Sequence, residues 1–171
     1  LNPFAHLDLF GTLALLLFGF GWAKPVPINP SRFKKPKRDM ALTALAGPLS
    51  NILLALVLMA IFKVYMLYGN INSTAGLMFG QIIYTILWTN LTLAVFNLLP
   101  VPPFDGSRIV LLFLPQKLYF QAMRYEKYIM GVVLLLVFFG LLNTPLNLCV
   151  NAAWRLLLNL TGFVELLFGI A

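Results

Sequence analysis

The residue in this sequence best suited to chemistry is a carboxylate that follows a proline-rich break in an apolar stretch. Asp105 comes directly after Pro-Val-Pro-Pro-Phe at residues 100–104 and is followed by Gly106. Prolines end a helix and free backbone carbonyls, and irregular backbone at membrane depth is tolerated only where it lines protein or a wet cavity. A carboxylate held there is suited to bind a metal ion or carry a proton. It could equally cap the short segment 107–114, with Arg108 as its ion partner. Both interpretations stay open at this point.

The composition indicates that the segments around Asp105 lie in a membrane. Of 171 residues, 61% are hydrophobic and 10% are charged, whereas a soluble domain is roughly half apolar and about 25% charged. A chain of this length buries only about 70% of its surface, so a single core cannot hide so many apolar side chains. An ordinary soluble enzyme and a disordered tail are therefore excluded. The sequence predicts an all-α polytopic membrane protein.

The charges are concentrated in two loops that flank apolar runs. There are 12 Lys and Arg residues against 5 Asp and Glu residues, a net charge of +7. Most of the positive charge lies in 24–39 and 116–127, which the positive-inside rule assigns to the cytoplasmic side. The uncharged stretches 69–75 and 143–147 are then expected on the opposite side. This pattern argues against nucleic acid as a partner, and the basic loops could contact anionic lipid head groups.

Four apolar runs predict membrane-spanning helices, and they cover residues 40–68, 76–98, 128–142 and 146–170. An earlier run, 9–23, is shorter and contains glycines, so we expect 9–27 to form a re-entrant hairpin; a short spanning helix is the alternative. We expect one membrane domain over 1–171, made of a hairpin and basic loop (1–39), core helices (40–115) and two C-terminal helices (116–171).

Three ionisable residues besides Asp105 fall within the apolar runs. Lys63 is near a predicted helix end, so we expect its long side chain to reach the interface. Arg155 and Glu165 are ten residues apart, whereas a pair within one helix needs a spacing of three or four. Each of these two is therefore expected near an interface or against a neighbouring helix.

Amide side chains form a second group of candidates. Asn90 and Asn97 are seven residues apart, which places them on one helix face. Amides between membrane helices often hydrogen-bond across the interface, but they could also orient Asp105 or hold substrate backbone. We expect Asn90 to join helices and Asn97 to orient Asp105.

Two motifs resemble those of a known family. Residues 97–106, Asn-Leu-Leu-Pro-Val-Pro-Pro-Phe-Asp-Gly, match the NxxPxPxxDG pattern of the site-2 protease family, the intramembrane zinc metalloproteases of peptidase family M50. Residues 46–51, Ala-Gly-Pro-Leu-Ser-Asn, are similar to the AGPxxN element of the preceding core helix. Residues 2–8 and 21–27 resemble the small bacterial branch without a PDZ domain. Residues 116–171 match only as generic membrane helices.

The resemblance implies a function and a set of roles. Asp105 would be the third zinc ligand, and the other two would be His residues of an HExxH helix whose Glu is the general base. Zinc lowers the pKa of its bound water to about 7, and the hydroxide attacks a substrate peptide carbonyl. Orienting or substrate-binding roles fall to Asn51, Asn90, Asn97, Pro100, Pro102 and Gly106.

The implied protein is an intramembrane protease of the bacterial plasma membrane that cleaves transmembrane segments in regulated intramembrane proteolysis. Its cofactor would be zinc. Its partners would be a transmembrane substrate, the bilayer and other membrane subunits.

The sequence departs from the family pattern at the zinc ligands. It has one histidine, His6, and no HExxH, so two His ligands and an Asp cannot be assembled from these residues. We expect the HExxH, with its catalytic Glu, to lie upstream of Leu1 in the natural protein. The alternative is a catalytically inactive relative with a structural or partner-binding role. His6 is expected to hydrogen-bond within the N-terminal hairpin rather than to bind zinc.

Overall fold

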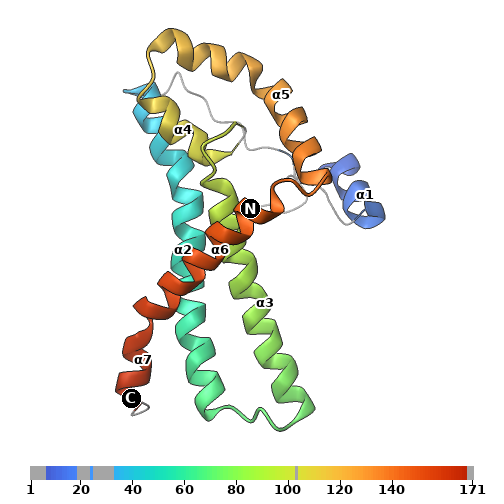
Figure 1. The fold of residues 1–171 in the computed structure, drawn as a ribbon, viewed down its shortest axis with the longest axis vertical. Coiled ribbons are helices and arrows are strands. Elements are labelled where there is room, and N and C mark those ends of the chain that lie inside the picture. Colours follow the sequence, from blue (N-terminus) through green and yellow to red (C-terminus); the bar gives the residue numbers. More distant parts are fainter. Residues whose placement is uncertain (1–6, 19–23, 25–32, 103, 169–171) are drawn as a thin grey trace. The chain divides into compact units, whose positions relative to one another are not determined.

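The computed structural model describes residues 7–18, 24, 33–102 and 104–168 (Figure 1). The chain divides into two compact units, Leu1–Pro36 and Lys37–Ala171. In the first unit, α1 (Leu9–Phe18) starts after Asp8, whose Oδ1 accepts a hydrogen bond of 2.8 Å from the Gly11 amide. This helix occupies the first part of the predicted hairpin. The rest of the hairpin lies almost wholly outside the described residues, as does His6, so the re-entrant path stays a prediction.

The described part of the second unit consists of helices joined by short connections, which confirms the predicted all-α class. In chain order they are α2 (Pro36–Tyr68), α3 (Thr74–Asn97), α4 (Asp105–Leu112), α5 (Gln116–Phe138), α6 (Asn143–Leu160) and α7 (Gly162–Leu167) (Figure 1).

The four membrane spans that we predicted are not confirmed. Among the described residues, α2 and α3 are long and apolar enough to cross a membrane. The C-terminal helices qualify only as a bent pair, with α5 on one side of an 86° bend and α6–α7 on the other, so the total is two spans or three. The bend follows Gly140, whose φ of 70° is in the left-handed region that favours glycine.

Several helix boundaries also differ from the prediction. The basic segment 116–127 was predicted as a loop but forms the first turns of α5, and the turn predicted at 143–147 is the start of α6. Likewise α2 begins at Pro36, where the missing amide hydrogen of proline costs no helix bond. Charged and polar residues mark where a chain can meet water, but they do not prevent a helix from continuing.

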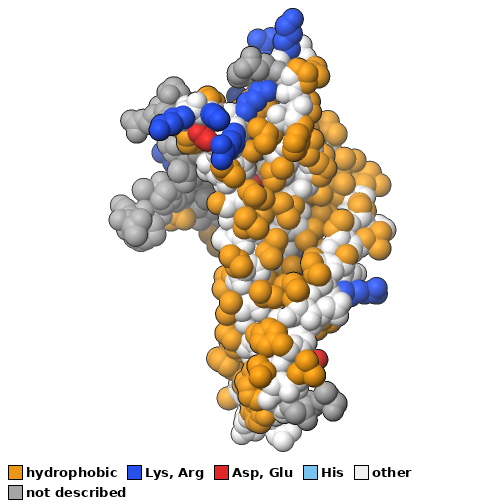
Figure 2. Space-filling model, turned by 90° about the vertical axis from the view of Figure 1, so that its left-hand side faces the viewer, with side chains coloured by type: hydrophobic (Ala, Val, Ile, Leu, Met, Phe, Trp, Pro, Cys, Tyr) orange, Lys and Arg blue, Asp and Glu red, His pale blue; other side chains and the backbone are white. Residues whose placement is uncertain are grey.

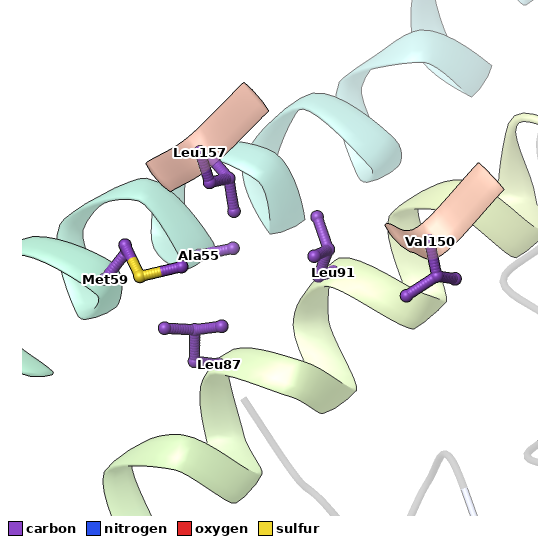
Figure 3. Close-up of a cluster of buried hydrophobic side chains, with 6 residues drawn as sticks. All are labelled: Ala55, Met59, Leu87, Leu91, Val150 and Leu157. Atoms are coloured by element: carbon purple, nitrogen blue, oxygen red, sulfur yellow. The ribbon is translucent and has the colours of Figure 1, made fainter. Parts of the chain in front are cut away.

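The core of the second unit lies where α6 crosses α2 and α3. Each helix contributes one face with residues four or seven apart, as helical periodicity requires. The buried cluster consists of Ala55, Met59, Leu87, Leu91, Val150 and Leu157 (Figure 3). Trp88 and Trp154 extend it, with ring centroids 5.4 Å apart.

Hydrophobic side chains cover much of the outer surface (Figure 2). Leu53, Phe79 and Leu135, for example, are each more than half exposed although they lie in three different helices. Exposed apolar surface on this scale is far beyond that of a soluble monomer. It supports the assignment of the chain as a membrane protein.

Candidate functional site

The proline-rich segment folds back against the end of α3. The amide of Leu98 donates to the Ala94 carbonyl at 3.0 Å and closes the last turn of the helix. The Phe104 amide then donates to the Val101 carbonyl at 3.1 Å. The rings of Phe96 and Phe104 meet edge to face with centroids 4.4 Å apart. These contacts fix the chain direction at the point where α4 begins, and therefore fix the place of Asp105.

Gly106 is required at its position by a close backbone approach. A Cβ on this residue would collide with the carbonyl group of Leu98 and would lie 2.7 Å from the carbonyl oxygen of Leu99. The start of α4 therefore rests directly on the backbone that leaves α3. A side chain of any size would separate the two and move Asp105, which explains physically why glycine follows the aspartate.

Asp105 faces the glycine of the other family motif. A Cβ placed on Gly47 in α2 would lie 3.5 Å from Asp105 Oδ2, an ordinary contact, so the carboxylate lies directly beside the helix at a point where a larger side chain would compete with it. Pro48, the next residue, is buried inside α2. The two motifs, far apart in sequence, thus meet at one place in the fold.

The helix-cap interpretation of Asp105 is wrong. The N-cap of α4 is Phe104, which makes no side-chain capping bond, and Asp105 is the first helical residue. The expected ion pair with Arg108 is not formed either. Instead Arg108 Nη2 donates to both carboxylate oxygens of Glu126 in α5 at 2.9 Å. The Asp105 carboxylate therefore has no structural partner among the described residues that would account for its place.

Burial raises the pKa of the Asp105 carboxyl, and the positive charge of Arg108 opposes this rise. The charged form of a carboxylate that is partly withdrawn from water is favoured by a positive ion placed against it. A bound metal would supply such a charge, so the environment of Asp105 is compatible with a ligand role.

The amides expected to support Asp105 occupy different surroundings. Asn97 is the last residue of α3, directly before the turn, and Asn51 lies one turn beyond Gly47 in α2. Asn90 instead donates to the carbonyl of Ile86 in its own helix at 2.8 Å. The expectation that Asn90 joins two helices is therefore not met in this structure.

Pro100 and Pro102 lie in the turn itself, between α3 and α4. Neither residue carries a side chain that could bind a ligand. Their effect is on the backbone, which they keep out of helical hydrogen bonding ahead of Asp105.

The described residues offer one candidate metal ligand, Asp105, rather than a complete site. No group of three or more His, Cys, Asp or Glu side chains lies together among them. A zinc site needs at least three protein ligands, and Asp105 fits as one of them because its carboxylate is accessible beside Gly47. The remaining donors are not present in the described part of the chain.

A membrane ion pair was missed by sequence reasoning. Lys63 Nζ contacts Glu165 Oε1 at 2.9 Å and donates to the Leu158 carbonyl at 3.1 Å. The Lys63 side chain is only 11% exposed, and its expected reach to the membrane interface stays a prediction. Glu165 does meet a neighbouring helix, as expected. The spacing of charges along one helix cannot reveal a pair between two helices.

Comparison with known proteins identifies a family profile and several similar proteins. Residues 64–140 match the sequence profile of peptidase family M50. The chain is 40% identical over 149 residues to "Putative zinc metalloprotease YwhC" of Bacillus subtilis (strain 168), an alignment that covers 86% of this chain and 65% of that protein. No solved structure gives a significant match.

Two archaeal proteins are also similar, both from Methanocaldococcus jannaschii. "Putative zinc metalloprotease MJ0611" is 36% identical over 60% of this chain and 49% of its own length. "Zinc metalloprotease MJ0392" is 31% identical over 64% of this chain and 31% of its own length. The chain thus spans less than two thirds of each of these relatives.

The fold and the motifs define a membrane protein with a metalloprotease-type aspartate turn. The profile match over residues 64–140 and the similar proteins support its assignment to peptidase family M50, the site-2 protease family.

Proposed function

We propose that this chain is part of an intramembrane zinc metalloprotease in which Asp105 is one of the zinc ligands. The observation that carries the proposal is the meeting of two motifs, with Asp105 Oδ2 placed against Gly47. The similarity to three proteins named as zinc metalloproteases supports the same chemistry. In the complete enzyme, an HExxH helix would supply the other two ligands and the general base.

Bound zinc would supply an activated water near neutral pH. The residues of this chain prepare the site for it. The turn after α3 and the glycine at 106 hold Asp105 at a fixed place, and Gly47 leaves the space that its carboxylate occupies. We assign Asn97 and Asn51 to orienting this carboxylate or the substrate backbone, because Asn97 ends α3 directly before the proline-rich turn and Asn51 lies one turn from Gly47 in α2.

We further propose that the enzyme cleaves transmembrane segments of other proteins, in the manner of regulated intramembrane proteolysis. The apolar surface supports a substrate that arrives through the bilayer. We place the basic segments 24–39 and 116–127 on the cytoplasmic side of a bacterial plasma membrane. Lys37 supports a common side, because it donates to the Leu114 carbonyl at 2.8 Å and lies 5.1 Å from the ring centroid of Tyr119.

The test is the Asp105→Asn variant of the full-length natural protein. Asparagine keeps the shape of the side chain but removes its charge, so we expect zinc content and cleavage of a transmembrane substrate to fall by more than about 100-fold. Loss of a residue that only orients a metal ligand typically costs about 10-fold to 100-fold, so a larger loss indicates a ligand. Zinc is measured by elemental analysis and cleavage by gel mobility of the substrate. Folding should survive, because the side chain makes no structural bond.

Asp39→Asn is the matched control. It makes the same chemical change near the start of α2, and we expect zinc content and cleavage to remain at wild-type levels. If Asp105→Asn also retained both, Asp105 would be a structural residue. A wild-type protein that bound no zinc and cleaved no substrate would instead indicate the inactive relative, for which the single histidine is the supporting observation.

A further inference from the structure

Arg108 is placed where two carboxylates can compete for its charge. It lies three residues after Asp105 in α4, and residues three apart are neighbours on a helix surface. In the structure, however, its guanidinium is turned to α5, where Nη2 donates to both carboxylate oxygens of Glu126 at 2.9 Å. The carboxylate that is nearer in sequence therefore receives no hydrogen bond from Arg108, because Glu126 receives it instead.

The charge of Arg108 acts on Asp105 even from this position. Burial raises the pKa of the Asp105 carboxyl, and the positive charge of Arg108 lowers it. A guanidinium bonded directly to the carboxylate would act more strongly, and it would occupy the oxygens through which a metal ion binds. A proton, a metal ion and a guanidinium compete for the same negative charge. An Arg108 side chain turned to Asp105 would thus oppose metal binding there.

The Arg108 guanidinium is costly to leave without a partner. The side chains of Arg108 and Glu126 are 18% and 26% exposed, so both charges are largely withdrawn from water. Arginine cannot lose its proton in a protein, and a charge withdrawn from water needs an anion or hydrogen-bond acceptors. If the Glu126 carboxylate were removed, the Asp105 carboxylate, one turn back in α4, would become an alternative partner for Arg108.

Helix α5 has other contacts with its unit besides this ion pair. Tyr119, in the first turn of α5, is buried, and Lys37 Nζ lies 5.1 Å from the centroid of its ring. Lys37 also donates to the carbonyl of Leu114, which precedes α5, at 2.8 Å. Loss of the pair between Arg108 and Glu126 would therefore leave α5 attached near α2.

We propose that Glu126 is a positioning residue of the zinc site, which holds the Arg108 guanidinium on α5 and so keeps the Asp105 carboxylate free to bind zinc. This inference rests on the proposed function, in which Asp105 is a zinc ligand. Glu126 does not touch the metal, and its effect on zinc passes through Arg108. Loss of Glu126 should therefore weaken zinc binding, whereas loss of Arg108 should not. A bridge that only joined two helices would give both losses the same effect.

The experiment measures the zinc affinity of the full-length natural protein in detergent micelles, by competition with a chelating dye. Glu126→Gln should weaken zinc binding by about tenfold, because the freed guanidinium then competes with zinc for Asp105. Arg108→Met breaks the same ion pair but also removes the competing charge, so it should bind zinc at least as tightly as the wild type. The variant with both changes should behave like Arg108→Met. Equal weakening by the two single changes would overturn the proposal.

Two further variants complete this measurement. Glu165→Gln is the matched control, because it removes a second carboxylate that pairs with a cation in the described part of this unit, and zinc affinity should not change. Glu126→Asp keeps the charge but draws the carboxylate back by one methylene group. It replaces Glu126→Gln if that variant does not fold, and it should weaken zinc binding to a smaller extent. Wild-type zinc affinity in the folded Glu126 variants would overturn the proposal.

A second readout needs no zinc. In the zinc-free full-length protein, the freed guanidinium should form a new pair with Asp105. Asp105→Asn should then change the unfolding equilibrium constant in mixed micelles by about threefold more in Glu126→Gln than in the wild type, the size of a partly exposed ion pair. This difference should disappear when Arg108→Met is added. An equal effect of Asp105→Asn in both backgrounds would contradict the proposed competition.

The same assays separate this inference from the proposed function. If Asp105→Asn bound zinc like the wild type, Asp105 would not be a ligand, and both the proposed function and the role of Glu126 would be wrong. If Asp105→Asn lost zinc while Glu126→Gln bound it like the wild type, the zinc ligand would stand and only the positioning role of Glu126 would be wrong.

Discussion

The turn that holds Asp105 and the C-terminal helices α5 to α7 are fixed in different ways. The turn depends on backbone groups in direct contact, with Gly106 seated on Leu98 and Leu99. Of the C-terminal helices, α6 packs into the core through Val150 and Leu157, whereas α5 and α7 are linked to the rest of their unit by long side chains, through Arg108 to Glu126 and Lys63 to Glu165. Backbone contacts of this kind cannot adjust to substitution, whereas flexible ion pairs can. A metal ligand needs the first kind of support, because small displacements of a functional group abolish its use.

The largest effect on stability is expected where the backbone contact is broken. Gly106→Ala places a methyl group against the carbonyls of Leu98 and Leu99, and we expect a loss of at least ~3 kcal/mol in the free energy of unfolding. The measurement is unfolding by SDS in mixed detergent micelles. Gly131→Ala is the control, because a Cβ there has open space around it. Equal stability of the two variants would show that the turn is not held by this contact.

An intermediate effect is expected for the ion pair of the C-terminal helices. Glu165→Gln leaves the nearly buried Lys63 ammonium with only the Leu158 carbonyl as a partner. We expect the free energy of unfolding to fall by about 2 kcal/mol. This loss is smaller than for a fully buried ion pair because the Glu165 side chain is 50% exposed. The double replacement Lys63→Met with Glu165→Leu should recover most of this loss. A double-mutant cycle under the same unfolding conditions gives the coupling, and additive effects would contradict a direct pair.

The smallest effect on folding, and the most informative one, is expected at Gly47. A Cβ there makes an ordinary contact of 3.5 Å with Asp105, so Gly47→Ala should be stabilising or neutral, with a gain of up to about 1 kcal/mol from helix propensity. Gly47→Leu, in contrast, should displace the carboxylate and lower zinc content in the full-length protein while the fold persists. If Gly47→Leu kept wild-type zinc content, the position of the Asp105 carboxylate would not depend on Gly47.

Sequence reasoning identified the parts of the molecule that depend on local chemistry. The apolar runs predicted α2 and α3 nearly to their ends, and the prolines predicted the break before Asp105. The number of spans was not predicted, because the bend at Gly140 and the start of α6 at Asn143 depend on how the helices pack.

The sequence by itself determined that this chain is an α-helical membrane protein with an aspartate on a rigid proline-rich turn, because composition, helix breaking and motif spacing are local properties. Only the tertiary structure decided which groups meet. It placed Asp105 against Gly47 rather than Arg108, and it paired Lys63 with Glu165. Such contacts join residues that are tens of positions apart, and their geometry depends on helix crossing and close backbone approach, which no single segment of sequence specifies.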